Sequence, residues 1–343
     1  MHNPHPALTP FQIAAESTSG RVAFVFAYRF AQRFNCRGKF QSLVRIYEYA
    51  ELACAIIAAR QADVIVVREF STFYFALFAP FLIPWLPKTV LINAHNVQAA
   101  NTSVLQRLLL NCICRFGTWL GCLEDAEGGR SILARRLQRR AICLPHPVPE
   151  RNEPWKARPS PEAGDLVVGL VGDFRPEKGG IDFLYVLSDA IRRLPFDVKV
   201  EIGKNGRVEI PELPVRVSPR DTSDEKAYRR FLASIHVLIV PYPAASYRYR
   251  ASGILSDACS CGTPVLATAL PCFERQVNTP ERGGICLAEE SLRNPELVAE
   301  ALAAIRADYA RFCAGVAANA ASRTLGRIQQ ALEKLRETVT TAK

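Results

Sequence analysis

Short apolar runs that do not alternate with polar residues constrain the fold of this chain more than any other feature. Residues 237–240 read VLIV, and similar runs occur at 63–67 (DVIVV), 166–170 (LVVGL) and 265–267 (VLA). A strand needs apolar residues at every position when both of its faces are buried, as in a parallel sheet covered by helices. Segments of helical length separate most of these runs, which is typical of parallel strands joined by right-handed crossovers. The sequence therefore predicts an α/β fold.

A stretch rich in proline and charge divides the chain, whose 343 residues are enough for about two domains. We expect a first domain over residues 1–150, a linker over residues 151–164 and a second domain over residues 165–343. Residues 294–338 have helical composition, and they can either cover the second domain or return to the first.

The charge of the chain restricts its partners. Lysine and arginine outnumber aspartate and glutamate by 43 to 33, which gives a net charge of +10. Residues 1–155 contain 17 basic and 10 acidic side chains, a balance that suits an anionic membrane surface or an acidic substrate. No basic cluster is interleaved with aromatic residues, so we do not expect nucleic acid as a partner.

Two segments of the first domain suggest contact with a membrane. Residues 70–87 carry no charge, but a span needs about 20 apolar residues and Pro80 and Pro84 interrupt this one. We expect a helix that is buried or grazes a membrane. Residues 130–140 contain five arginines and are expected to form a basic helix, which either lies on anionic lipid or is simply solvated.

The cysteines indicate a reducing environment. The chain contains 11 of them without a CxxC spacing, and most lie in apolar runs. Their odd number and the lack of a secretory signal pattern predict a cytoplasmic location. We expect no metal site.

Residues 247–268 (YRYRASGILSDACSCGTPVLAT) read as a loop, a helix start and a buried strand. Ser252 can cap the helix, Gly253 lets the backbone approach a ligand, and a helix start favours an anion. Arg248 and Arg250 lie just upstream, and Asp257 lies one turn into the helix, where its carboxylate can accept hydrogen bonds from ribose hydroxyls. We interpret this stretch as a phosphate site, with a solvated loop as the alternative.

A second basic turn follows the first strand expected in the second domain. It reads VGDFRPEKGG, in which Gly172 permits close backbone approach and Arg175 and Lys178 supply two cations. Two cations at the carboxyl end of a strand can hold a diphosphate. The turn matches neither GxGxxG nor GxxxxGK[ST], so a dinucleotide fingerprint and a P-loop are both unsupported.

In order and spacing these blocks resemble the GT-B-fold glycosyltransferases, and glycosyltransferase family 4 most of all. The resemblance covers most of residues 165–343 and, more weakly, residues 62–148; it rests on VGDFRPEKGG, on HVLIVPYPAASYRYRASGILSDACSCGTPVLAT and on RGGICLAEE. It implies two Rossmann-like domains facing across a cleft. It also implies transfer of a sugar from a nucleoside diphosphate sugar, the donor, to an acceptor hydroxyl, without a further cofactor.

The resemblance also implies roles for single residues of the second domain. Arg175 and Lys178 would contact the diphosphate of the donor. Ser252 and Gly253 would offer N–H groups to it, and Asp257 would take the position of a glutamate that binds ribose.

Two further positions bear on sugar and acceptor. Tyr249 stands where the family has its first glutamate, a departure that concerns sugar recognition and stereochemistry. TVLINAHN resembles a strand that ends in a histidine facing the cleft, so His95 is the candidate for contact with the reacting sugar or the acceptor. The alternative is that His95 makes a structural hydrogen bond.

These expectations describe a glycosyltransferase that needs no bound metal, since the chain contains no DxD triplet. Its acceptor would be lipid-linked or part of a surface polysaccharide, and the protein would be cytoplasmic with peripheral contact to the inner membrane face. Two alternatives stay open. One is a nucleotide-sugar epimerase or phosphorylase of the same fold, and the other is a catalytically degenerate binding or scaffold protein, suggested by Tyr249.

Overall fold

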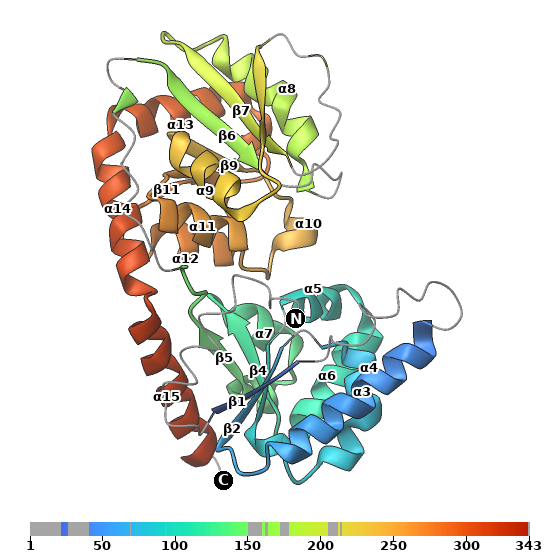
Figure 1. The fold of residues 1–343 in the computed structure, drawn as a ribbon. Coiled ribbons are helices and arrows are strands. Elements are labelled where there is room, and N and C mark those ends of the chain that lie inside the picture. Colours follow the sequence, from blue (N-terminus) through green and yellow to red (C-terminus); the bar gives the residue numbers. More distant parts are fainter. Residues whose placement is uncertain are drawn as a thin grey trace. The chain divides into compact units, whose positions relative to one another are not determined.

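The chain folds into two compact units, each built on one sheet (Figure 1). In this computed structural model the described residues are 22–26, 41–68, 70–92, 94–149, 160–161, 164–171, 178–204, 212 and 215–341. The first unit comprises Met1–Pro147 with Leu325–Lys343, and the second comprises Val148–Thr324.

The sheet of the first unit is parallel and follows the order of the chain. Its described strands are β1 (Val22–Phe26), β2 (Val64–Arg68), β3 (Thr89–Ile92), β4 (Trp119–Leu123) and β5 (Ala141–Leu144). All residues of β2 and β3 are buried, as expected of strands covered on both faces. Because each new strand joins the same edge, right-handed crossovers place the connections on one face. The opposite face needs a cover from elsewhere in the chain.

The last helix, α15 (Leu325–Thr341), supplies this cover. Its buried residues Ile328, Leu332, Leu335 and Val339 recur every three or four positions and pack against the strands in one core cluster. Arg336 adds an ion pair with Asp63, in which Nη1 and Oδ2 are 3.2 Å apart. Of the two placements considered for the C-terminal helices, return to the first domain therefore describes residues 325–343, which lie in the first unit.

The first unit contains five further described α-helices and three 3₁₀ helices. They are α3 (Gln41–Ala58), α4 (Thr72–Phe78), α5 (Ala94–Thr102), α6 (Val104–Arg115) and α7 (Glu127–Ile132), with the 3₁₀ helices η2 (Ala79–Leu82), η3 (Leu86–Lys88) and η4 (Arg135–Arg140). Figure 1 shows α3, α4 and α6 on the side of the sheet away from α15. None of the described helices is long and apolar enough to cross a membrane.

Two expected helices are broken. The uncharged run at 70–87 divides into α4, η2 and η3, and Pro80 lies at the start of η2. The basic helix expected at 130–140 is wrong, because Leu133 is extended, with φ −88° and ψ 143°, and separates α7 from η4. The five arginines therefore do not share one helical face.

The sheet of the second unit is also parallel, but its order reverses once. The order is β11-β10-β9-β6-β7-β8, with strands β6 (Leu166–Val171), β7 (Val198–Lys204), β8 (Val217–Asp221), β9 (Val237–Val240), β10 (Val265–Thr268) and β11 (Gly284–Leu287). The chain moves outward from β6 to β8 and then returns to place β9 on the other side of β6. This is the doubly wound arrangement of Rossmann-like domains.

Helices cover both faces of this second sheet. One core cluster joins the strands to α8 (Gly180–Ile191), α13 (Pro295–Ala307) and the start of α14 (Tyr309–Ser322). The other joins them to α9 (Glu225–Ser234), α11 (Gly253–Cys261) and α12 (Pro271–Asn278). The short elements α10 (Ala244–Tyr247) and η7 (Ser291–Arg293) complete the unit. The predicted α/β class is confirmed in both units.

Candidate functional site

The site begins where the order of the second sheet reverses, between β6 and β9. In an open α/β sheet, ligands bind beyond the carboxyl ends of the strands at this kind of point. The described residues there line a shallow depression that is open to solvent: Leu170, Val171, Lys178, Gly180, Ile239, Pro241 and Tyr242. Lys178, expected from the sequence to bind a diphosphate, therefore lies at the switch point.

Gly179 brings the segment before α8 close to the end of β9. Its φ is +66°, which disfavours side chains, and a Cβ there would lie 3.0 Å from the carbonyl oxygen of Pro241. Glycine thus allows the two backbones to approach. As a result Lys178 and Tyr242 border the same depression.

Two tyrosines hold cations from two different segments. The ring centroids of Tyr242 and Tyr247 are 4.4 Å apart. Lys178 Nζ lies 5.8 Å from the Tyr242 ring centroid, and Arg250 Cζ lies 5.4 Å from that of Tyr247. Electron-rich ring faces stabilise cations at these distances. The two cations are separated by 72 positions in the sequence, and the tyrosine pair brings them together.

Arg250 retains an unused donor. Its guanidinium is half-buried, which lowers its pKa below the usual value, and neighbouring Tyr247 partly opposes this shift. Arginine nevertheless stays charged at neutral pH. Its buried Nε has no hydrogen-bond partner among the described residues. A buried N–H of a cation without a partner is costly, and an anionic ligand would satisfy it.

Arg248 occupies a different environment from Arg250. It is exposed, and its Cζ lies 5.8 Å from the ring centroid of Tyr249 rather than on the Tyr242–Tyr247 pair. Of the two loop arginines, Arg250 is therefore the one tied to the same aromatic pair as Lys178.

The start of α11 is locked by a residue that the sequence analysis did not identify. The Ser252 N–H donates to Gln276 Oε1 at 2.8 Å, and Gln276 Nε2 donates to the Ser252 carbonyl at 2.9 Å and to Ser256 Oγ at 3.1 Å. The Ser252 side chain makes no capping bond. In this arrangement the Ser252 N–H is therefore already used by Gln276, and its contact with a diphosphate stays a prediction. Gly253 keeps the expected position as the first residue of α11.

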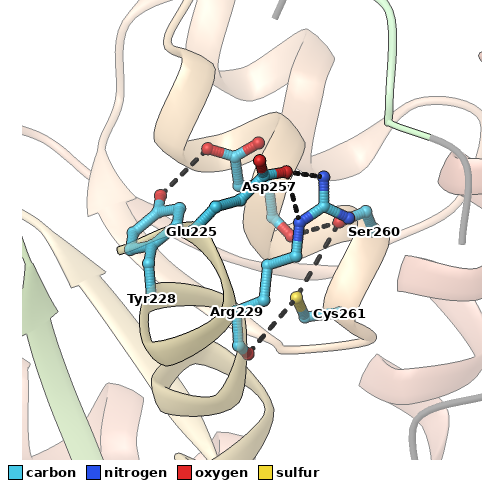
Figure 2. A network of polar contacts seen from close by, with 6 residues as sticks. All are labelled: Glu225, Tyr228, Arg229, Asp257, Ser260 and Cys261. Atoms are coloured by element: carbon cyan, nitrogen blue, oxygen red, sulfur yellow. Dashed lines mark hydrogen bonds and ion pairs between the residues drawn. The ribbon is translucent and has the colours of Figure 1, made fainter. Parts of the chain in front are cut away.

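Asp257 contacts the neighbouring helix α9, as Figure 2 shows. The Tyr228 hydroxyl donates to Asp257 Oδ2 at 2.9 Å, while Arg229 on the same helix pairs with Glu225. Burial raises the pKa of Tyr228, and the charge of Asp257 raises it further. Tyr228 thus remains a hydrogen-bond donor over a wide pH range. Asp257 was expected to bind ribose, and one of its two carboxylate oxygens already accepts a hydrogen bond from the protein.

The remaining expected residues are placed only in part. Gly172 and Arg175 lie outside the described residues. His95 was expected at the end of a strand, but β3 ends at Ile92 and the backbone of His95 lies in the first turn of α5. The described residues include ten cysteines, none of them in a disulfide, and no group of three or more His, Cys, Asp or Glu that could hold a metal ion.

The residues that the sequence analysis did not identify differ in whether their local sequence could have indicated them. Tyr242 lies two residues after the end of β9, and Tyr247 lies next to Arg248, so aromatic residues near a strand end or a cation could have indicated them. Gln276 and Tyr228 lie on α12 and α9. Nothing in their local sequence indicates a contact with α11.

No family model and no curated protein matches the chain. Solved structures match nearly all of it. Anabaena HepE in complex with UDP has a TM-score of 0.66 and 14% identity, covering 98% of both chains. An E. coli trehalose-6-phosphate structure bound with UDP-2-fluoro glucose has a TM-score of 0.65 and 10% identity, covering 98% of this chain and 97% of that one.

A third match is an α,α-trehalose-phosphate synthase (UDP-forming) from Burkholderia vietnamiensis, with a TM-score of 0.60, 11% identity and coverage of 98% and 95%. At these identities the likeness shows the fold alone. The chain has the GT-B architecture of two Rossmann-like domains, as predicted.

Proposed function

We propose that the second unit binds the diphosphate of a nucleotide sugar and that the protein transfers the sugar to an acceptor hydroxyl. The observation that carries this proposal is the placing of Lys178 and Arg250 on one tyrosine pair at the switch point of the sheet. A diphosphate presents several anionic oxygens within reach of two such cations. HepE, which has a similar fold, was solved in complex with UDP and with UDP-glucose, and this supports a uridine nucleotide as the donor.

The protein would contribute to the proposed reaction mainly by neutralising the charge of the departing diphosphate. The bond between the anomeric carbon and the diphosphate oxygen breaks, and its electron pair leaves with the diphosphate. Lys178, Arg250 and Arg175 would stabilise the charge that develops there, without a metal or a further cofactor. The acceptor oxygen bonds to the anomeric carbon and loses its proton. Holding donor and acceptor together supplies much of the rate.

Roles for the other expected residues belong to the same proposal. Gly172 and Gly253 would let the backbone approach the phosphates, Arg248 would assist from the loop, and Asp257 would bind ribose. His95 would contact the reacting sugar or the acceptor. We propose an acceptor that is lipid-linked or part of a surface polysaccharide, since residues 1–155 are basic. That the two domains face across a cleft stays a prediction.

A binding or scaffold protein of this fold is the second candidate. Tyr249 at the position of the family's first glutamate favours it, as do the existing partners of the Ser252 N–H and of Asp257. An epimerase or phosphorylase is supported by the fold alone.

Donor turnover separates these candidates. Purified protein is incubated with labelled UDP-sugars, with and without saccharide and lipid-linked acceptors, and the released UDP and the sugar products are identified. We expect UDP release that falls about 100-fold or more in Lys178→Ala/Arg250→Ala, because two charge-assisted contacts are lost. Arg230→Ala, an exposed arginine on α9, is the control and should turn over normally. Isomerised sugar would indicate an epimerase, and binding without turnover a scaffold.

A further inference from the structure

Large apolar side chains are exposed on two neighbouring helices of the first unit. On α6, Val104, Leu105 and Leu108 are 69%, 59% and 63% exposed. On α4 and η2, Phe73, Leu77 and Phe81 are 55%, 52% and 72% exposed. The two helices pack against each other, and Figure 1 shows them side by side. We call these six residues the α4–α6 apolar surface.

Water does not favour such a surface. Full burial of a large apolar side chain is favourable by about 1.5–3 kcal/mol of free energy relative to leaving it exposed to water. Monomeric proteins rarely leave extended apolar patches uncovered, and those that exist commonly mark interaction sites. Among the described residues of the second unit, Tyr185 alone is a large apolar side chain with comparable exposure. The exposed large apolar side chains are therefore concentrated in the first unit, and the α4–α6 apolar surface contains the six most exposed of those described.

The charges around this surface indicate the kind of partner. The chain contains no aspartate or glutamate between Glu69 and Glu124. Over the same interval it contains three cations, of which Arg107 and Arg115 are exposed on α6 itself. Arg107 is held in place by hydrogen bonds to the carbonyl oxygens of Ala100 and Asn101, at 3.2 and 2.9 Å. An apolar surface flanked by arginines, with no acidic residue in the segment, complements an anionic partner.

We propose that the α4–α6 apolar surface docks on an anionic lipid membrane. Its apolar side chains would enter the boundary between headgroups and acyl chains, and Arg107 and Arg115 would approach lipid phosphates. A second copy of the chain would present the same positive charges, so this partner fits less well. Docking is independent of sugar transfer, and its failure would leave the proposed donor site untouched.

Vesicle binding tests the proposal directly. The full chain is mixed with vesicles of phosphatidylcholine alone or with phosphatidylglycerol added, and the bound fraction is measured by flotation. Binding should require phosphatidylglycerol and weaken with salt. Leu105→Ser/Leu108→Ser should lower the partition coefficient about tenfold or more. Arg115→Gln should lower it about fivefold. Tyr185→Ser, which changes an exposed aromatic residue of the second unit, is the matched control and should bind normally.

Equal binding by wild type and Leu105→Ser/Leu108→Ser would overturn the proposal, as would equal binding to neutral vesicles. Neither leucine belongs to the buried core, so this variant should fold. An exposed cysteine of the native sequence allows a second, independent measurement that needs no mutation.

Cys112 is exposed on α6, one turn after Leu108, whereas the exposed Cys143 lies on the edge strand β5. Alkylation by a water-soluble maleimide, mapped by mass spectrometry, should be slowed by anionic vesicles at Cys112 but not at Cys143. Unchanged alkylation of Cys112 would contradict docking. Protection without vesicles would also contradict it: if it grows with protein concentration a second copy covers the surface, and otherwise another segment of the chain does.

Discussion

At the scale of single residues, Gln276 should be the strongest determinant of how α11 begins. Its buried amide satisfies both the N–H and the carbonyl of Ser252. Gln276→Leu leaves these two buried groups without partners, so the free energy of unfolding should fall by about 2 kcal/mol in urea titrations. Glu274→Gln, an exposed change on the same helix, should alter it by less than about 0.5 kcal/mol. Equal stability of Gln276→Leu and wild type would refute this role.

Tyr228 should make stability depend on pH in the alkaline range. Burial and the charge of Asp257 raise its pKa, so the folded protein holds this proton more tightly than the unfolded chain does. The resulting stabilisation is complete below about pH 10, the usual pKa of tyrosine, and is lost as the pH rises above it. Compared with Tyr228→Phe, wild type should lose about 1.4 kcal/mol per pH unit above pH 10. A difference between the two proteins that stays constant from pH 8 to 11 would contradict this.

Candidate site residues can be selected from the sequence where chemistry and chain position coincide. Lys178 and Arg250 lie in turns next to a strand end and a helix start, so local pattern located both. Their joint placement on Tyr242 and Tyr247 depends on tertiary packing, which no local pattern reveals. The same holds for Gln276, whose hydrogen bonds also use the Ser252 N–H that the sequence had suggested for the ligand.

At the scale of elements, α15 should be essential to the first unit although it comes last in the chain. Leu332 is fully buried in the core cluster that α15 shares with the first sheet. Leu332→Ala should lower the free energy of unfolding by about 2–5 kcal/mol, because it removes buried methyl groups and leaves a cavity. Lys334→Ala, an exposed neighbour on the same helix, is the control for urea unfolding. A loss below about 1 kcal/mol would contradict this packing.

Strands were predictable where burial imposes a run of apolar residues. The run VLIV coincides with β9, and LVVGL lies within β6. The strand β8 was missed, because its sequence VSPRD is partly or fully exposed and carries no apolar signal. The basic helix at 130–140 failed for a different reason, since composition alone does not show that Leu133 is extended.

At the scale of the whole molecule, the architecture persists with little sequence identity. HepE matches 98% of this chain at 14% identity. A doubly wound parallel sheet requires only buried strands, covering helices and a point where the strand order reverses. Many sequences meet these conditions. Fold therefore does not establish activity, and the functional argument depends on Lys178, Arg250 and the residues that hold them.

The most direct test of the central claim is thermal and urea unfolding of the protein with UDP, compared with uridine, which lacks the diphosphate. A ligand that binds only the folded state stabilises it by about 2.7 kcal/mol at 100 times its Kd. We predict stabilisation by UDP but not by uridine, lost in Lys178→Ala/Arg250→Ala and retained in Arg230→Ala. If no nucleoside diphosphate stabilises the wild type, or if UDP stabilises the double variant equally, then the second unit does not hold a diphosphate at this site.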